Sequence, residues 1–224
     1  MGIELKNKQK EVLLSILEKF YSENGDFSSL CEESAGEIGD TEDYAFHYGA
    51  SKGVIIPLKE EDRSIFPYVI KIPFLYEDEE CETKIVNHCR LEQKNSIAAA
   101  ALDLSDILIP TDYFGHFASA EIYIQQQVEY PKKIIIRNSW NILSEKYGVN
   151  QTGQIDPNLS LHIIEYYGLK KFFELVEFVE EKRINDLHGG NYGFIDGRPV
   201  IFDYSGYYGA DYSSSSLSST RCTF

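Results

Sequence analysis

The sequence is poor in basic residues and has no long apolar run. Only 21 Lys and Arg residues stand against 36 Asp and Glu, which gives a formal charge of −15 over 224 residues. Binding to nucleic acid or to anionic lipid depends on a positively charged surface. No apolar run approaches the roughly 18 residues that a membrane-spanning helix requires. We therefore expect partners that are neither nucleic acid nor membrane.

Cysteines are also few, and their spacing suggests no disulfide framework. The four cysteines are scattered and form no C-x-x-C pair. This usage is typical of a reducing compartment, and the first residues lack the apolar segment of a secretory signal. The expected location is cytoplasmic, in a bacterial or host cell interior. A zinc site is an alternative, but the adjacent His88 and Cys89 have poor chelating geometry, so buried thiols are favoured.

The first 130 residues predict a small sheet with two helices. Apolar spacing indicates an amphipathic helix over 5–21, followed by a polar, acidic loop. Three β-branched and aromatic runs within 44–76 are typical of an antiparallel meander. A helix is expected over 82–102 and two more strands over 112–130. Because strands and helices do not alternate regularly, a Rossmann sheet is disfavoured.

The rest of the chain predicts helices and one hairpin. Helical patterns cover 138–148, 158–168 and 169–183, and apolar runs flank an Asp-Gly turn signal within 192–203. The last residues are Ser-rich and low in complexity, which favours a flexible tail. The expected units are an N-terminal helix with its loop, a sheet region, a mainly helical region with the hairpin, and the tail, at 1–43, 44–130, 131–212 and 213–224.

Three polar residues around the hairpin carry the strongest chemical signal. If the hairpin turns about Gly197, Asn191 lies roughly opposite Asp203, within about one residue of register. An amide and a carboxylate oxygen so placed suit Mg²⁺, a hard cation. Asp186 lies on the loop that leads into the hairpin, close enough to orient an attacking hydroxyl. The pattern predicts a metal site at one end of the ribbon.

These residues resemble the catalytic motifs of the protein kinase-like fold. Asp186-Leu-His-Gly-Gly-Asn191 matches D-x-x-x-x-N, and Asp203-Tyr-Ser-Gly206 takes the place of D-F-G. The variant D-L-H-x-x-N is similar to aminoglycoside-type phosphotransferases and to divergent bacterial or phage kinase-like proteins. The resemblance implies that Asp186 is catalytic and that Asn191 and Asp203 bind Mg²⁺. It leaves His188 either contacting phosphate or bracing the catalytic loop.

The same resemblance places a nucleotide-binding lid early in the sheet. The segment Gly-Ala-Ser-Lys-Gly-Val, residues 49–54, joins the first two expected strands, where the family has its glycine-rich loop. A turn between strands favours glycine in any case, and a serine replaces the usual second glycine. On this resemblance, the lid residues that contact nucleotide are Gly49, Ser51, Gly53 and Val54.

A lysine and a glutamate complete the implied ATP site. Val69-Ile70-Lys71-Ile72 matches the family's V-A-I-K strand, and a lysine inside an apolar strand is costly unless its ammonium meets anions. The family pairs this lysine with ATP phosphates and with a helix glutamate, for which we select Glu92. The alternatives are a solvent-facing edge lysine and a surface glutamate. Adenine would bind backbone groups of the hinge, at Gln127 and Val128.

The fold class implied is α+β, a kinase-like two-lobe fold with a five-stranded antiparallel N-lobe sheet and a truncated, mainly helical C-lobe. The activity implied is that of an ATP- and Mg²⁺-dependent phosphotransferase, first of all a minimal Ser/Thr protein kinase. The alternatives are a small-molecule kinase of the aminoglycoside type and a non-catalytic kinase-like binding module. The acceptor would be a protein or small-molecule hydroxyl.

The sequence also departs from the family pattern. Ile184 and Asn185 replace the usual His-Arg before the catalytic aspartate, and Tyr204 replaces the phenylalanine of D-F-G. Only 21 residues follow Asp203, and they contain no A-P-E motif. The missing helices would leave a surface on the C-lobe for a protein partner.

Overall fold

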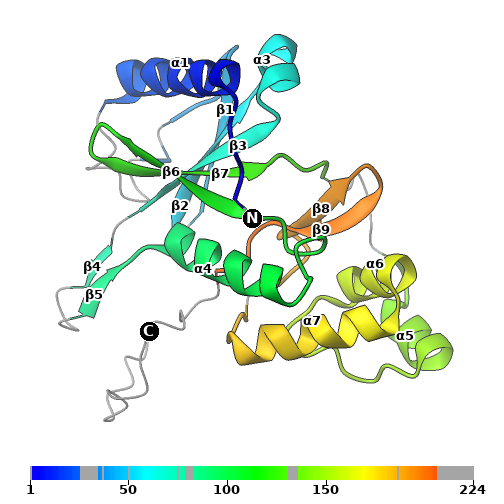
Figure 1. Cartoon of the computed structure of the whole chain (residues 1–224). Helices are drawn as coiled ribbons and strands as arrows, with labels where there is room; N and C mark the ends of the chain where they lie inside the picture. The colour runs from blue at the N-terminus through cyan, green and yellow to red at the C-terminus, as the bar shows by residue number, and fades with distance from the viewer. Residues whose placement is uncertain are drawn as a thin grey trace.

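The computed structural model is an α+β chain, in which a five-stranded antiparallel sheet is followed by a mainly helical region (Figure 1). It describes residues 2–25, 35–36, 38–49, 51–74, 76–78, 83–130, 136–185 and 187–205. The expected Ser-rich tail and Asp186 lie outside the described residues. Within these ranges, no helix is both long enough and apolar enough to cross a membrane.

The sheet confirms the expected number and direction of strands. In spatial order its strands are β1 (Tyr44–Tyr48), β2 (Lys52–Pro57), β3 (Tyr68–Pro73), β7 (Ala120–Gln126) and β6 (Thr111–Phe117). All four neighbouring pairs are antiparallel. The first three strands form the meander that the apolar runs predict, and a short helix, α3 (Glu60–Ile65), connects β2 to β3.

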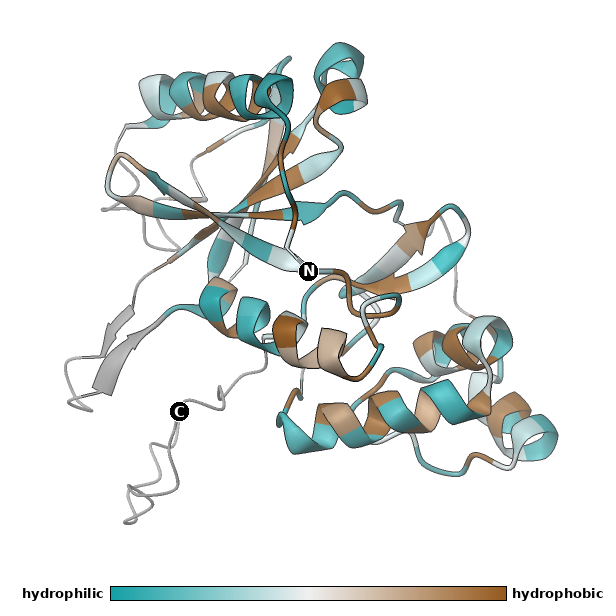
Figure 2. Cartoon of the chain, viewed as in Figure 1, coloured by the Kyte–Doolittle hydropathy of each residue, from teal (hydrophilic) through white to brown (hydrophobic). Residues whose placement is uncertain are grey.

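The two faces of the sheet have different chemistry. Phe46, Ile55, Ile70 and Ile124 occupy one cross-strand row and are all buried. This face packs against α1 (Asn7–Asn24), which lies across the top of the sheet in Figure 1 and shows alternating hydrophobic and hydrophilic positions in Figure 2. Because side chains alternate along a strand, the neighbouring row points to the opposite face, and it contains Lys71.

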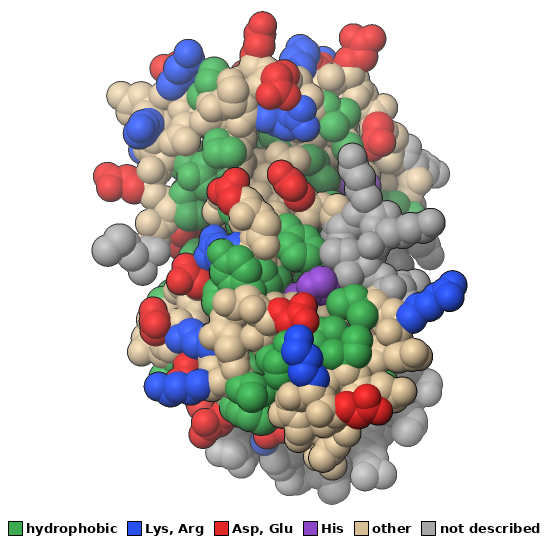
Figure 3. Space-filling view, turned by 90° about the vertical axis from the view of Figure 1, so that its right-hand side faces the viewer, with side chains coloured by type: hydrophobic (Ala, Val, Ile, Leu, Met, Phe, Trp, Pro, Cys, Tyr) green, Lys and Arg blue, Asp and Glu red, His purple; other side chains and the backbone are tan. Residues whose placement is uncertain are grey.

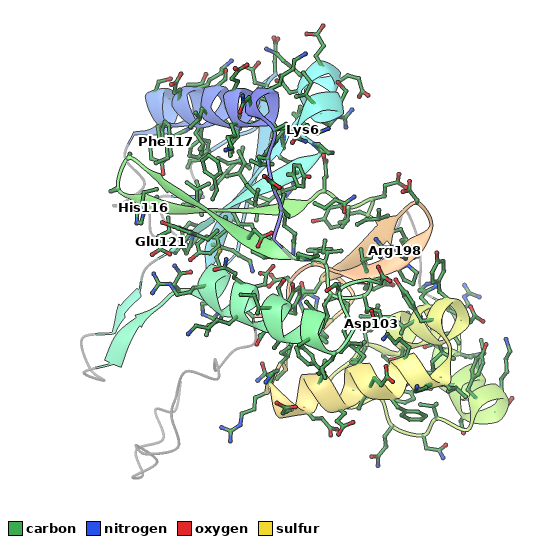
Figure 4. The ribbon with its side chains drawn as sticks, viewed as in Figure 1. Lys6, Asp103, His116, Phe117, Glu121 and Arg198 are labelled. Atoms are coloured by element: carbon green, nitrogen blue, oxygen red, sulfur yellow. The ribbon has the colours of Figure 1, made fainter. Side chains whose placement is uncertain are left out.

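The helix α4 (His88–Ala101) is fixed at its start to strand β7. The side chain of Asn87 accepts a hydrogen bond from the Arg90 amide at 2.9 Å, which caps the helix. Asn87 and Tyr123 also donate to one oxygen of Glu121, at 2.7 and 2.6 Å, and Arg90 pairs with the other. Figure 4 shows Glu121 at the edge of the sheet beside the start of this helix.

The predicted helix over 82–102 is wrong at its start. Residues Thr83–Val86 form strand β5, which pairs with β4 (Tyr76–Asp78) in a separate two-stranded ribbon. The sequence Thr-Lys-Ile-Val is rich in β-branched residues, which favour strands over helices. The helix begins only after Asn87, a residue that prefers the cap position.

The second region contains the expected helices and hairpin. The helices are α5 (Ser139–Tyr147), α6 (Pro157–Tyr167) and α7 (Leu169–Glu181), and the hairpin strands are β8 (Tyr192–Ile195) and β9 (Arg198–Ile201). Asp196 and Gly197 both have positive φ, at 51° and 77°, as a type I′ turn requires. The helices bury a second hydrophobic core that also contains Tyr192, Ile201 and Tyr204.

The hairpin joins the two regions. On one side, the Ile201 amide donates to Ile107 at 2.7 Å and the Ile109 amide donates to Ile201 at 3.1 Å. On the other side, Glu129 and Phe194 exchange two backbone hydrogen bonds of 2.8 and 2.9 Å. A Cβ atom on Gly193 would lie 2.8 Å from the Glu129 carbonyl oxygen, so this close approach requires glycine. The end of the hairpin is therefore held at a fixed position beneath the sheet.

Phe20 provides a test of the packing between α1 and the sheet. Its side chain is fully buried, with its ring 5.3 Å from those of Tyr44 and Phe46. Phe20→Ala should lower the free energy of unfolding by about 3–5 kcal/mol, because it leaves a cavity. Leu14→Ala, on the outer side of the same helix at 38% exposure, should change it by no more than about 0.5 kcal/mol. Urea unfolding measures both, and equal losses would contradict this packing.

Candidate functional site

Lys71 and Glu92 form a buried ion pair beneath the sheet. The Lys71 Nζ atom lies 2.5 Å from Glu92 Oε1 and 2.8 Å from the carbonyl oxygen of Phe202. Their side chains are 2% and 0% exposed. The alternatives of a solvent-facing lysine and a surface glutamate are therefore wrong. The pair joins β3, α4 and the segment that follows the hairpin.

Two neutral side chains hold Glu92 in this position. Thr111 Oγ1 and Gln125 Nε2 donate to Glu92 Oε1 at 2.5 and 3.0 Å, and Gln125 also donates to the Ile109 carbonyl at 3.1 Å. A buried carboxylate is stable only where several donors replace its lost hydration. Thr111 and Gln125 meet that requirement, and nothing in the sequence pattern identified either of them.

A second buried lysine was not foreseen. Lys52 Nζ lies 3.0 Å from Glu92 Oε2 and 2.7 Å from Asp203 Oδ1, and its side chain is 6% exposed. We call Lys52, Lys71, Glu92 and Asp203 the lysine–carboxylate cluster. Strand periodicity offered the available signal, since Lys52 precedes Val54 by two residues and Val54 pairs directly with Lys71. All three residues therefore share the face of the sheet that points to α4.

The arrangement of the cluster explains its shifted pKa values. Burial lowers the pKa of Lys52, but Asp203 and Glu92 outweigh this effect and leave the pKa raised. Lys71 has the opposite balance, because burial and the nearby Lys52 lower its pKa against the pull of Glu92. For Asp203, burial raises the pKa, but the two lysines outweigh burial and leave it lowered. The Asp203 carboxylate is thus kept charged.

The two predicted metal ligands lie at one end of the hairpin. Tyr192 pairs with Ile201, and the Phe202 amide donates to the Asn191 carbonyl at 3.1 Å, so Asn191 is within one residue of Asp203 in register. This confirms the predicted register. Asn191 is buried, whereas the Asp203 side chain is 32% exposed.

The donor chemistry of this pair fits Mg²⁺. Asp203 Oδ2 makes no hydrogen bond to any residue that the structure describes, and amide and carboxylate oxygens are the ligands that Mg²⁺ prefers. Over the same residues, no group of three or more His, Cys, Asp or Glu side chains could hold a metal. An ion on this pair would consequently need further oxygens from phosphate or water.

His188 braces the loop that precedes the hairpin. Its Nδ1 accepts a hydrogen bond from the Gly190 amide at 2.9 Å, and its carbonyl accepts one from Asn191 at 3.0 Å. A Cβ atom on Gly190 would lie 2.8 Å from the imidazole ring, so glycine lets the ring approach the loop. Of the two roles that the sequence left open, these contacts favour bracing.

The lid turn connects β1 to β2 directly above Lys52. The Gly49 amide donates to the Lys52 carbonyl at 3.0 Å, and Ser51 precedes the strand. A Cβ atom on Gly53 would lie 2.6 Å from the Phe46 ring, so this glycine is required by packing within the sheet. Val54, opposite Lys71, is the lid residue that faces the cluster.

Hinge residues Gln127 and Val128 differ in their backbone bonding. The Gln127 amide donates to the Pro67 carbonyl at 3.0 Å, so it is already engaged. Among the described residues, no backbone hydrogen bond uses the amide or carbonyl of Val128. Figure 3 shows this side of the molecule, where hydrophobic side chains gather across the middle, at the level where the two regions meet. Val128 is thus the better placed of the two for an adenine base.

Cys89 has the environment of a structural thiol. It is fully buried beside the cluster, and burial raises the pKa of its thiol to about 12. The buried-thiol interpretation of this cysteine is confirmed, and the other three cysteines lie outside the described residues.

Comparison with protein-family models, with curated proteins and with solved structures finds no match to this chain.

Two glycines of the lid, Gly49 and Gly53, test whether the packing of the sheet requires glycine at position 53. Gly53→Ala should lower the free energy of unfolding by about 1–3 kcal/mol, because the added methyl group overlaps the Phe46 ring. Gly49→Ala is the matched control, since a methyl group added there would have nothing within 4 Å. The control should stay within about 0.5 kcal/mol of the parent. Thermal or urea unfolding of both variants decides this, and an unaffected Gly53→Ala would remove the packing argument.

Proposed function

We propose that this chain is an ATP- and Mg²⁺-dependent phosphotransferase with a protein kinase-like two-lobe fold. The sheet region would be the N-lobe, and the helical region with its hairpin would belong to the C-lobe. The observation that carries the proposal is the buried Lys71–Glu92 pair at 2.5 Å, set beside Asp203. These residues lie far apart in sequence, and they match three separate family motifs that converge on one site.

Each residue of the site has a role in this proposal. Lys71 would neutralise phosphate charge and Glu92 would position it, while Asn191 and Asp203 would hold the metal. When bound, Mg²⁺ would offset the negative charge of the phosphates. Asp186 would orient the acceptor hydroxyl or remove its proton. Catalysis of this class depends mainly on positioning and electrostatics, which a rigid, buried cluster supplies.

A Ser/Thr protein kinase is the favoured form of this activity, because the part of the helical region that the structure describes contains no added subdomain to enclose a small acceptor. A specific observation keeps a small-molecule kinase as the second candidate. His188 accepts a hydrogen bond from the Gly190 amide of its own loop. A histidine that stabilises the loop in this way is consistent with the D-L-H-x-x-N pattern of the aminoglycoside type. A kinase-like module that binds ATP without transferring phosphate is the non-catalytic alternative.

Nucleotide binding is the first test. Mg-ATP at a hundredfold excess over its Kd should add about 2.7 kcal/mol to the free energy of unfolding, because only the folded protein binds it. Lys71→Met and Asp203→Asn should each lose most of this gain. Lys59→Met is the matched control, since Lys59 pairs with Asp43 away from the cluster. A thermal melt of each protein with and without about 1 mM Mg-ATP supplies the comparison.

An unchanged melting temperature of the parent protein in Mg-ATP would overturn the nucleotide-site assignment. The melt without ligand matters equally, because a variant that is already unfolded says nothing about binding.

Phosphoryl transfer is the second test. Asp186→Asn should keep Mg-ATP binding yet slow transfer from γ-labelled ATP by at least about a hundredfold, as loss of a catalytic base does. Asp196→Asn, at the hairpin turn, is the control, because asparagine tolerates the positive φ of 51° found there. A cell extract and a panel of aminoglycosides serve as acceptors. Equal turnover by parent and Asp186→Asn would exclude this residue from the mechanism, and binding without transfer by the parent would favour the non-catalytic alternative.

A further inference from the structure

Lys52 is a second buried lysine in the site, and its ion pairs connect the two regions of the chain. Its ammonium bridges two carboxylates that come from different regions, Glu92 of α4 and Asp203 after the hairpin, at 3.0 and 2.7 Å. Lys71 already satisfies the other oxygen of Glu92. Lys52 also begins β2, directly after the lid turn, so its backbone belongs to the segment closest to where the phosphates would lie.

The contact between Lys52 and Asp203 conflicts with a metal on the same carboxylate oxygen. Mg²⁺ binds oxygen at about 2.0–2.1 Å, and Lys52 Nζ is 2.7 Å from Asp203 Oδ1. The two cations would then be separated by less than about 5 Å, where like charges in a buried site repel strongly. Asp203 Oδ2 could take the metal instead, but Mg²⁺ on either oxygen would offset the charge of this carboxylate and weaken its attraction for Lys52.

The anion that could receive Lys52 is limited by the surroundings. A buried ammonium without a carboxylate or phosphate partner is costly. Glu92 alone would have to serve both Lys52 and Lys71, whose ammonium groups repel each other. A phosphate oxygen bound beneath the lid would give Lys52 an anionic partner in place of Asp203.

We propose that, in the phosphotransferase described above, Lys52 is a second phosphate-binding lysine that exchanges Asp203 for a nucleotide phosphate, which would leave that carboxylate available to Mg²⁺. This inference rests on the proposed function and adds a second cation to the site, supplied by the lid strand. It has two consequences. ATP should bind measurably without Mg²⁺, because two lysines meet its phosphates, and Mg²⁺ should have to compete with Lys52 for Asp203.

Calorimetric titration with ATP tests both consequences. In EDTA, Lys52→Met should weaken ATP binding by at least about tenfold, the effect of losing one charge-assisted hydrogen bond. At saturating ATP, the Mg²⁺ concentration at which half of the sites hold the ion should fall in Lys52→Met, since the ammonium that competes for Asp203 is gone. Removal of a lysine that only paired with Asp203 would also lower that midpoint, so the loss of ATP affinity in EDTA is the result that distinguishes phosphate binding from a structural role. Lys59→Met should match the parent in both titrations.

The outcomes distinguish this inference from the proposed function. If the parent binds no nucleotide with or without Mg²⁺, the proposed function fails and the inference fails with it. If the parent binds Mg-ATP, but Lys52→Met leaves the ATP affinity in EDTA unchanged, only the inference is overturned.

A labelling measurement on the parent protein guards against a variant that does not fold. With an acyl-phosphate derivative of ATP, a lysine beside the phosphates loses a proton and its amine attacks the acyl carbon. The bond from that carbon to the phosphate oxygen breaks, an amide forms on the lysine, and ATP leaves. Peptide mapping should find the acyl group on Lys52, and excess ATP should suppress it there but leave any label on Lys59. Labelling of Lys52 that ATP does not suppress would overturn the inference.

Discussion

The buried lysine–carboxylate cluster is the interaction on which the rest of the structure depends. Two ammonium groups and two carboxylates balance one another, and each would be very costly to bury without its partners. The cluster draws one residue each from β2, β3, α4 and the segment after the hairpin. Its formation therefore requires the sheet, the helix and the hairpin to be in place together, which couples the two regions electrostatically as well as by packing.

Neighbouring hydrogen bonds hold in place the helix and the segment that carry the two carboxylates of this cluster. Glu121 fixes the start of α4, and Asn95 on the same helix donates to the Tyr204 carbonyl at 3.0 Å. The Tyr204 hydroxyl in turn donates to the Ile109 carbonyl at 2.7 Å, next to the segment that pairs with β9. The helix that carries Glu92 and the segment that carries Asp203 are thus tied to each other and to the sheet. The Tyr204 side chain is buried in the core, and its hydroxyl adds one buried hydrogen bond that a phenylalanine could not make.

The parts of the site that depend on local backbone geometry could be predicted from the sequence. The Asp-Gly turn sets the hairpin register, so the nearness of Asn191 and Asp203 followed from counting residues. The pairing of Lys71 with Glu92 came from resemblance, because no local rule connects residues 21 apart across a loop. Lys52 escaped notice because its position at the end of a strand looked like part of a turn, and only the long-range packing of α4 and the hairpin supplies its anions. The β4–β5 ribbon was missed for a related reason, since the acidic run before it obscured a short β-branched segment.

The overall charge of the chain makes the local cluster more important. A protein with a formal charge of −15 repels a polyanion such as ATP at long range, but salt screens this repulsion beyond about 8 Å under physiological conditions. Attraction must then come from cations within contact distance of the phosphates, where the buried surroundings keep their charges effective. A single lysine paired with Glu92 would contribute little net positive charge. In the proposed nucleotide site, two lysines that share that glutamate would provide more positive potential, and Asp203 would hold one of them until a phosphate takes its place.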